Sequence, residues 1–190
     1  MTLEPEQVVR QAGVEKVPDG VKVRYLRDDY AVLFSCAEVR RVEPPHQEAD
    51  VLTATVLAHY LLTADGRPLT NTFASYRELP GAGIYYGPFV ARTVKPLLRA
   101  FGEHPERLLL AGRALGGTSQ EVGDASITLQ ILPRLPVTYA IWRGDDEVAS
   151  SGTVLFDASA SGYLPLEDLV VAAAHGAYAL LKAPTGEKEA

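Results

Sequence analysis

Residues 127–141 read Ile-Thr-Leu-Gln-Ile-Leu-Pro-Arg-Leu-Pro-Val-Thr-Tyr-Ala-Ile, and this stretch decides the fold. Apolar residues alternate with other residues on both sides of Pro133-Arg134-Leu135-Pro136, and a period of two is typical of a strand with one buried face. Proline lacks the amide hydrogen that a central strand must donate. The stretch therefore predicts two strands, with either a β-bulge or a crossing between sheet regions at the prolines.

A second region with the same period lies near the beginning of the chain. Alternation covers 21–25 and 30–34, with Arg27-Asp28-Asp29 between them, and a third extended piece covers 38–42. Strand, polar turn, strand and strand in this order predict a β-meander. Cys36 lies in this region, where we expect a small, buried apolar residue.

Segments with helical periodicity lie between the two β-regions and after the second one. Asp50 can cap a helix that runs to Ala64 and is apolar almost all round, so we expect it to be largely buried. A helix that begins at Pro88 must kink or split at Pro96, which removes a backbone donor. A last helix is predicted from Pro165 to about 181 or 182.

The order of these elements predicts an α+β fold. Two mainly antiparallel β-regions flank a helical middle, and the C-terminal helix packs on the sheet. The length of 190 residues suits a single domain over 1–190, with a core of about 4–182 and a frayed tail at 183–190.

Composition excludes several classes of protein and site. The net charge of −6 disfavours nucleic-acid binding, which gains its affinity from basic side chains. A single cysteine excludes a disulfide framework, an all-cysteine zinc site and a cysteine-held iron–sulfur cluster within this chain. The acidic N-terminus and the lack of an apolar run of about 20 residues predict no signal peptide and no membrane span. We therefore expect a cytoplasmic protein.

Histidines offer one candidate site. His59 lies with Thr55 and Thr63 on a polar stripe of the 50–64 helix, which either faces water or lines a wet pocket. In a pocket, its ordinary pKa of ~6.5 would suit it to carry a proton or to serve as an axial ligand. His175 shares a helix face with charged residues and is expected to be solvated.

Three carboxylates form a second candidate group near strand ends of the second β-region: Asp124, Glu147 and Asp157. Such residues either perform acid–base chemistry or make turns and structural pairs. Arg134, between two prolines, could pair with one of them in a charge-assisted hydrogen bond.

The chain resembles domain-of-unknown-function family 3786 over roughly residues 4–181. In the second half, the similar motifs are Gly123-Asp124, Leu132 to Pro136, Trp142 to Glu147 and Val154 to Asp157. In the first half they are His59-Tyr60-Leu61-Leu62 with Gly66, and 73–79.

The resemblance implies no established activity. Relatives in anaerobic bacteria and archaea occur joined to iron–sulfur domains or near corrinoid and one-carbon enzymes. Because this chain has Cys36 alone, it lacks a cluster-binding module. A redox link would therefore have to come through a partner protein.

Two main hypotheses follow. The first is a non-catalytic domain that binds a small molecule or cofactor, for example a tetrapyrrole or corrinoid, between the 50–64 helix and the second β-region. Its candidate ligand-binding residues are His59, Tyr76, Arg77, Asp124 and Arg134. The alternative is a small hydrolase or transferase that uses Asp124, Glu147 or Asp157, or an accessory subunit of a redox or one-carbon enzyme system with a protein partner or a second copy. No cofactor is identified, and no metal site is predicted.

Overall fold

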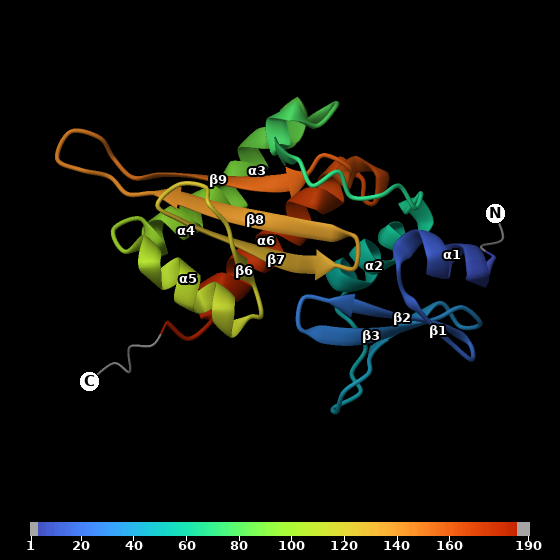
Figure 1. Ribbon diagram of the computed structural model, residues 1–190. Coiled ribbons are helices and arrows are strands. Elements are labelled where there is room, and N and C mark those ends of the chain that lie inside the picture. Colours follow the sequence, from blue (N-terminus) through green and yellow to red (C-terminus); the bar gives the residue numbers. More distant parts are fainter. Residues whose placement is uncertain (1–3, 186–190) are drawn as a thin grey trace.

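Two antiparallel sheets form the framework of the protein, which the computed structural model describes over residues 4–185 (Figure 1). The first sheet is a meander whose four strands lie in chain order. These strands are β1 (Glu15–Val17), β2 (Gly20–Tyr25), β3 (Asp28–Leu33) and β4 (Glu38–Arg41). The meander predicted from the alternation is confirmed, with β1 added at its edge.

The second sheet has the order β5-β9-β8-β7-β6, and every neighbouring pair is antiparallel. Three long strands form its centre, and two short strands form its edges. The strands are β5 (Phe73–Ser75), β6 (Thr118–Ser119), β7 (Ala125–Leu132), β8 (Leu135–Trp142) and β9 (Ser151–Asp157).

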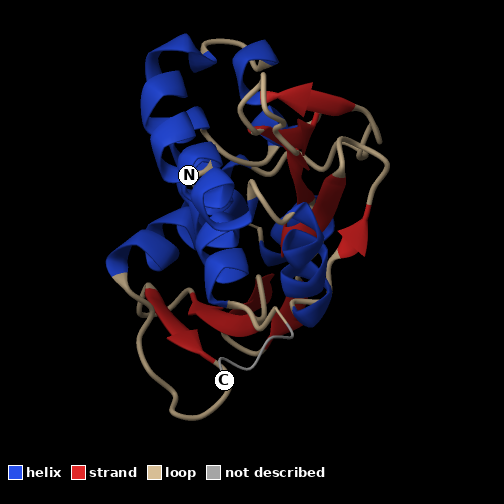
Figure 2. Cartoon of the chain, turned by 90° about the vertical axis from the view of Figure 1, so that its left-hand side faces the viewer, coloured by secondary structure: helices blue, strands red, loops and turns tan. Residues whose placement is uncertain are grey.

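The helices lie mainly on one side of the second sheet (Figure 2). Helices α4, α5 and α6 pack on its central strands, and no helix within residues 4–185 lies on its other face. The helices are α1 (Pro5–Ala12), α2 (Val51–Thr63), α3 (Tyr86–Arg92), α4 (Val94–Phe101), α5 (Pro105–Ala114) and α6 (Leu166–Lys182). Short 3₁₀ helices are η1 (Tyr76–Glu78), η2 (Ala82–Tyr85) and η3 (Ala160–Gly162). This arrangement confirms the predicted α+β class.

Register explains why the alternation in 127–141 is so regular. Ile127 pairs with Tyr139 and Leu129 with Val137, and all four side chains are buried. Thr128 pairs with Thr138 between them and belongs to the other face, because successive side chains alternate across a strand. Pro133 and Arg134 form the turn between β7 and β8, which are neighbours in one sheet, so the expected crossing between sheet regions is wrong. The register shifts between Gln130 and Leu132, which fits a bulge beside this turn.

Two hydrogen-bonded joints connect the N-terminal part of the chain with the second sheet. At the turn between β2 and β3, the Leu26 N–H donates to the Ile131 carbonyl at 2.9 Å. On α2, the fully buried Tyr60 hydroxyl donates to the Ala12 carbonyl at 2.6 Å and accepts from the Arg134 N–H at 3.0 Å. The N-terminal part is thereby fixed to the second sheet at the end of β7 and the β7–β8 turn.

Two expectations about the burial of apolar residues were wrong. Helix α2 is only partly buried, since Val51 is 81% exposed and Leu52 and Leu62 are also exposed. Its contacts come from α1 and α6, which cover only part of its circumference. Cys36 is exposed because it lies in the turn between β3 and β4 rather than in a strand.

Other expectations about helices are confirmed. The chain breaks between α3 and α4 at Thr93, three residues before Pro96, as a proline at the start of a helix allows. Asp50 caps α2, since its carboxylate accepts from the Thr53 N–H at 3.0 Å. The C-terminal helix covers 166–182. The predicted frayed tail falls largely on 186–190, which lie outside the described residues.

Candidate functional site

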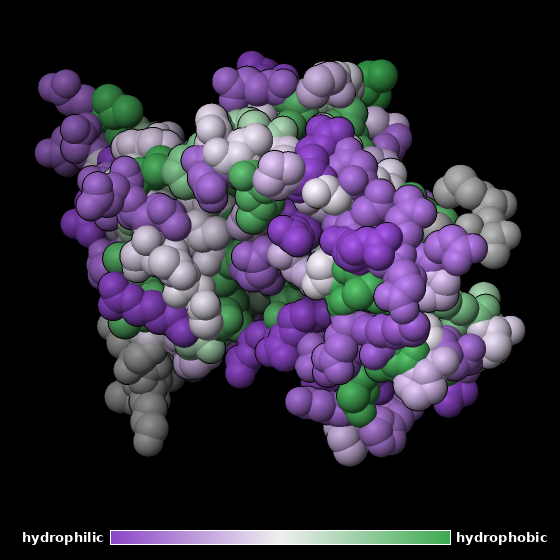
Figure 3. All heavy atoms as spheres, turned by 45° about the vertical axis from the view of Figure 1, so that its right-hand side comes forward, coloured by the Kyte–Doolittle hydropathy of each residue, from purple (hydrophilic) through white to green (hydrophobic). Residues whose placement is uncertain are grey.

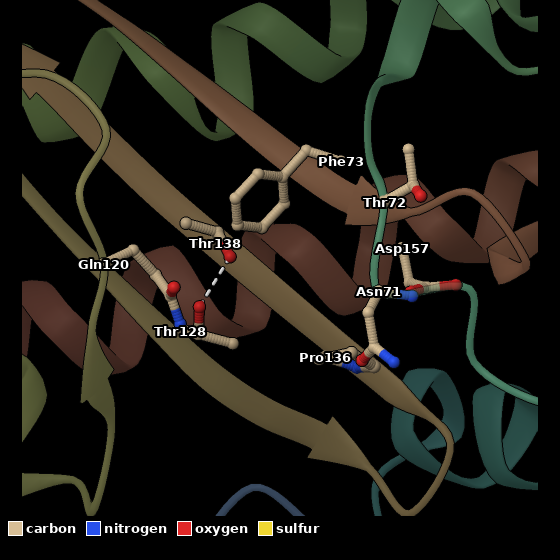
Figure 4. A pocket seen from close by; sticks show the side chains of 8 residues that line it. All are labelled: Asn71, Thr72, Phe73, Gln120, Thr128, Pro136, Thr138 and Asp157. Atoms are coloured by element: carbon tan, nitrogen blue, oxygen red, sulfur yellow. Dashed lines mark hydrogen bonds between the residues drawn. The ribbon is translucent and has the colours of Figure 1, made fainter.

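A hollow of about 210 Å³ opens on the helix-free face of the second sheet (Figure 4). Four separate parts of the chain contribute its walls: the segment 71–73 that leads into β5, the residue after β6, the β7–β8 hairpin and the end of β9. The lining residues are Asn71, Thr72, Phe73, Gln120, Thr128, Pro136, Thr138 and Asp157. Hydrogen-bonding groups and apolar groups thus share one small concave site.

The base of the hollow is set by strand register. Thr128 and Thr138 face each other across β7 and β8, and their hydroxyls are 2.6 Å apart. Only one hydrogen lies between these two oxygens, so the pair keeps one O–H donor and acceptor capacity for another molecule. The Phe73 ring stands beside them and is 48% exposed, which leaves a ring face available.

Asp157 organises one side of the hollow. Its carboxylate accepts from the backbone and hydroxyl of Thr70, both at 3.0 Å, and from the Asn71 N–H at 2.7 Å. It also accepts from the Ser159 N–H at 2.9 Å and hydroxyl at 2.6 Å. These bonds hold Asn71 in a left-handed conformation with φ of 55°. The rim of the hollow is therefore built on a carboxylate.

Hydrogen bonding also keeps Asp157 ionised. Burial by itself would raise the pKa of this carboxyl, but the bonds from Ser159 and Thr70 outweigh it and lower the pKa to about 2. A carboxylate with so low a pKa is a poor proton acceptor near neutral pH. Of the two roles considered for strand-end carboxylates, this geometry favours the structural one.

His59 pairs with a carboxylate on the neighbouring helix. Its Nδ1 lies 2.5 Å from Oδ2 of Asp168, a largely buried residue in the first turn of α6. The His59 side chain is 46% exposed, so it is neither fully in water nor enclosed in a pocket, the two environments considered for it. The contact through Nδ1 fixes the ring, so Nε2 is the nitrogen left for another partner.

Tyr76 and Arg77 lie in η1 and contact other parts of the protein. The buried Tyr76 ring stacks on Phe89 at 4.4 Å, and its hydroxyl donates to the Leu166 carbonyl at 3.0 Å. Burial raises the pKa of Tyr76 to about 12. The Arg77 guanidinium lies 3.9 Å from the centre of the Tyr86 ring. Both side chains therefore have clear packing roles.

Asp124 and Arg134 do not come together. They flank β7, a strand of eight residues, and such a strand is about 27 Å long. Asp124 accepts from the Arg143 N–H at 2.7 Å, whereas the Arg134 N–H binds Tyr60. The five candidate ligand residues thus do not line one hollow, and the ligand-binding role of each stays a prediction.

The three candidate acid–base carboxylates are also separated. Asp124 and the exposed Glu147 lie toward the end of the sheet where the β8–β9 loop turns, and Asp157 lies at the opposite end, next to β5. Glu147 donates its N–H to Asp145 at 2.9 Å within that loop. Only Asp157 lines the hollow described above.

His175 is not solvated as expected. It is partly buried, and its Nδ1 lies 2.7 Å from the Tyr25 hydroxyl on β2. Burial lowers the pKa of His175 below its ordinary value of 6.5, while the Asp50 carboxylate opposes this shift. The sequence pattern failed here because the first sheet covers this side of α6.

Sequence reasoning missed most of the hollow. Thr128 and Thr138 occupy the alternate positions of two predicted strands, so the alternation itself marks them as members of one face. Asn71, Phe73 and Gln120 reach the site only through the pairing of β5 and β6 with distant strands, and no local signal shows that pairing.

Two kinds of feature are absent from the described part of the chain. Among residues 4–185, no three or more His, Cys, Asp or Glu side chains gather in a way that could hold a metal ion. Within the same range, no helix has both the length and the apolar character to cross a membrane.

Comparison with known proteins identifies a family. No curated protein and no solved structure matches the chain. The model of one family, described as Domain of unknown function (DUF3786), matches residues 4–179 and so spans both sheets and nearly all of α6. The resemblance seen in the sequence motifs is confirmed, and the chain belongs to the DUF3786 family.

Proposed function

We propose that this domain binds a small, neutral, planar molecule in the hollow on the open face of the second sheet. The observation that carries the proposal is the joint presence of an exposed aromatic ring and several amide and hydroxyl groups around about 210 Å³. Small-molecule sites are concave and combine apolar walls with a few convergent polar groups.

The size of the hollow limits the ligand. Pockets for drug-sized ligands have volumes of ~300–1,000 Å³, and this hollow is smaller. A tetrapyrrole or corrinoid macrocycle exceeds it, so the proposal does not extend to those cofactors. A single ring with one or two polar substituents matches the volume.

The lining favours a neutral ligand. Asp157 is the one charged residue among the eight that line the hollow, and its oxygens already accept five hydrogen bonds from Thr70, Asn71 and Ser159. Side-chain amides of Asn71 and Gln120 both donate and accept. A planar amide or lactam can stack on Phe73 while it exchanges hydrogen bonds with these groups.

The test uses benzamide, nicotinamide and uracil as probes, titrated into the ¹⁵N-labelled full chain. We expect chemical-shift changes at the backbone amides of Asn71, Gln120 and Thr138. Phe73→Ala removes the stacking surface and should weaken binding by about tenfold, as expected for ~1–1.5 kcal/mol.

Thr138→Val keeps the shape of the side chain but removes the hydroxyl, and should also weaken binding. The matched control is Thr153→Val, which changes the same residue type on the same sheet face, opposite Ala140 and outside the hollow. Failure of all three probes to perturb these amides, or equal affinity of the Phe73→Ala variant, would refute the proposal.

A further inference from the structure

A second hollow, of about 260 Å³, lies where the first sheet meets the second. Its walls come from the β2–β3 turn, the end of α5, strand β7 and helix α6. The lining residues are Arg24, Leu26, Arg27, Leu115, Gly116, Leu129, Gln130 and Ala179. In Figure 3 the surface is recessed between the first sheet and the rest of the molecule, with hydrophobic residues inside the recess and hydrophilic residues at its rim.

The two arginines differ in what they contact. The Arg24 guanidinium forms an ion pair with Asp29 at 3.2 Å and donates through Nε to the Leu26 carbonyl at 3.3 Å. The exposed Arg27 guanidinium has no ion pair and no hydrogen bond among residues 4–185. One guanidinium is thus held in place by the protein, and the other is available to an anion.

The remaining wall is mainly aliphatic. Leu26, Leu115 and Leu129 come from three separate parts of the chain and line the same hollow, together with Ala179 of α6. Leu26 and Leu115 are only partly buried, so their side chains offer surface that a ligand could remove from water.

The backbone at this hollow is strained. Leu26 has a φ of 54°, a left-handed conformation that an L-residue with a branched side chain rarely adopts. The bond from its N–H to the Ile131 carbonyl at 2.9 Å holds it there. Glycine would relieve the strain, but it would remove a side chain that lines the hollow. The two-residue turn between the paired residues Tyr25 and Asp28 requires this conformation.

We propose that this hollow binds a small aliphatic carboxylate. The carboxylate would accept two hydrogen bonds from the Arg27 guanidinium, whose planar fork matches its geometry. The hydrocarbon chain would lie along the partly buried Leu26 and Leu115. This site is separate from the hollow on the sheet face, since the two share no lining residue and differ in charge.

The experiment titrates the full chain with hexanoate, followed by calorimetry and by amide shifts of Leu26, Gly116 and Gln130. Hexan-1-ol tests the need for a charge, and hexyl phosphate tests whether a phosphate can replace the carboxylate. We expect hexanoate to bind at least about tenfold more tightly than hexan-1-ol, because hydrogen bonds to charged groups are the stronger class.

The decisive variant is Arg27→Gln, which lies in an exposed turn and should weaken hexanoate binding at least about tenfold. Its matched control is Arg99→Gln, at an exposed position of α4 outside this hollow, which should bind like the unmodified protein. Equal binding of hexanoate and hexan-1-ol, or unchanged affinity of Arg27→Gln, overturns the proposal. Tighter binding of hexyl phosphate overturns the choice of carboxylate.

Discussion

Asp157 joins two segments that are far apart in the sequence, the loop at 70–71 and the turn at Ser159. Replacing it with asparagine removes the charge and turns one acceptor into a donor that faces other N–H groups. We expect Asp157→Asn to destabilise the protein by about 2 kcal/mol, the free energy that corresponds to a pKa lowered from 3.8 to about 2. Urea unfolding at pH 7 measures this difference.

The contribution of Asp157 to the free energy of unfolding should also depend on pH. Since folding lowers the pKa of Asp157, its stabilisation is complete above about pH 4 and is lost as the pH falls toward 2. The stability gap between the unmodified protein and Asp157→Asn should shrink over that range. Asp146→Asn, an exposed change in the β8–β9 loop, is the control and should leave stability unchanged. A constant gap down to pH 2 would contradict the assignment.

Among the elements, α6 approaches the second sheet closely at Gly176. A Cβ at this position would lie 2.0 Å from the Tyr139 hydroxyl and 2.7 Å from Cδ1 of Ile131. Tyr139 cannot move freely, because it is fully buried and its hydroxyl donates to the Ala173 carbonyl at 2.8 Å. Gly176→Ala should therefore destabilise the protein by ~1–3 kcal/mol, although alanine favours helices.

Gly87→Ala in α3 is the matched control, since a Cβ there meets nothing within 4 Å. It should leave the thermal melting temperature unchanged or raise it. Adding Tyr139→Phe to Gly176→Ala removes the nearest atom and should recover part of the loss in a double-mutant cycle. A Gly176→Ala variant as stable as the unmodified protein would mean that α6 packs less closely than described.

The sequence was informative where an element carries its own period. The alternation in 127–141 and the near-continuous apolar run of 166–181 predicted β7, β8 and α6, because each buries one face or stripe on the core. β5 and β6 have three and two residues, too few to show a period, so they were not predicted. The prediction that helix α2 is largely buried was wrong for another reason, since an apolar residue such as Val51 can remain exposed.

The candidate sites were less predictable than the fold. Asp157 was found as a strand-end carboxylate, but its hydrogen bonds come from residues more than 80 positions earlier as well as from Ser159 nearby. His59 was found as a polar residue on an apolar helix, yet its partner Asp168 lies 109 positions later. Residue type and spacing can nominate such groups, whereas only tertiary pairing assigns their partners.

At the scale of the whole molecule, His175 and Tyr25 connect α6 to the first sheet. Because burial lowers the pKa of His175, the unfolded chain binds a proton more readily than the folded protein below about pH 6.5. We expect the free energy of unfolding to be greatest above pH 6.5 and to fall as the pH drops below it. Urea unfolding between pH 5 and 8 measures this slope.

His175→Gln keeps an acceptor for the Tyr25 hydroxyl but cannot be protonated, so it should flatten the slope between pH 5 and 7. Asp50, whose carboxylate acts on His175 from the start of α2, stays in place in this variant. His104→Gln, at an exposed position before α5, should keep the slope of the unmodified protein. An unchanged slope in His175→Gln would assign the pH dependence to other groups.

The short strands β5 and β6 limit how copies of this protein can pair edge to edge through the larger sheet. A long edge strand with unpaired amide and carbonyl groups can pair with strands of other molecules, and such pairing leads to fibres. Here the edge strands themselves have only three and two residues, too few for another chain to pair with along their length, although residues 151–154 of β9 have no strand on the β5 side. Pairing of another molecule's strand with β5 or β6 is thereby disfavoured, and the sheet face without helices remains accessible to a ligand.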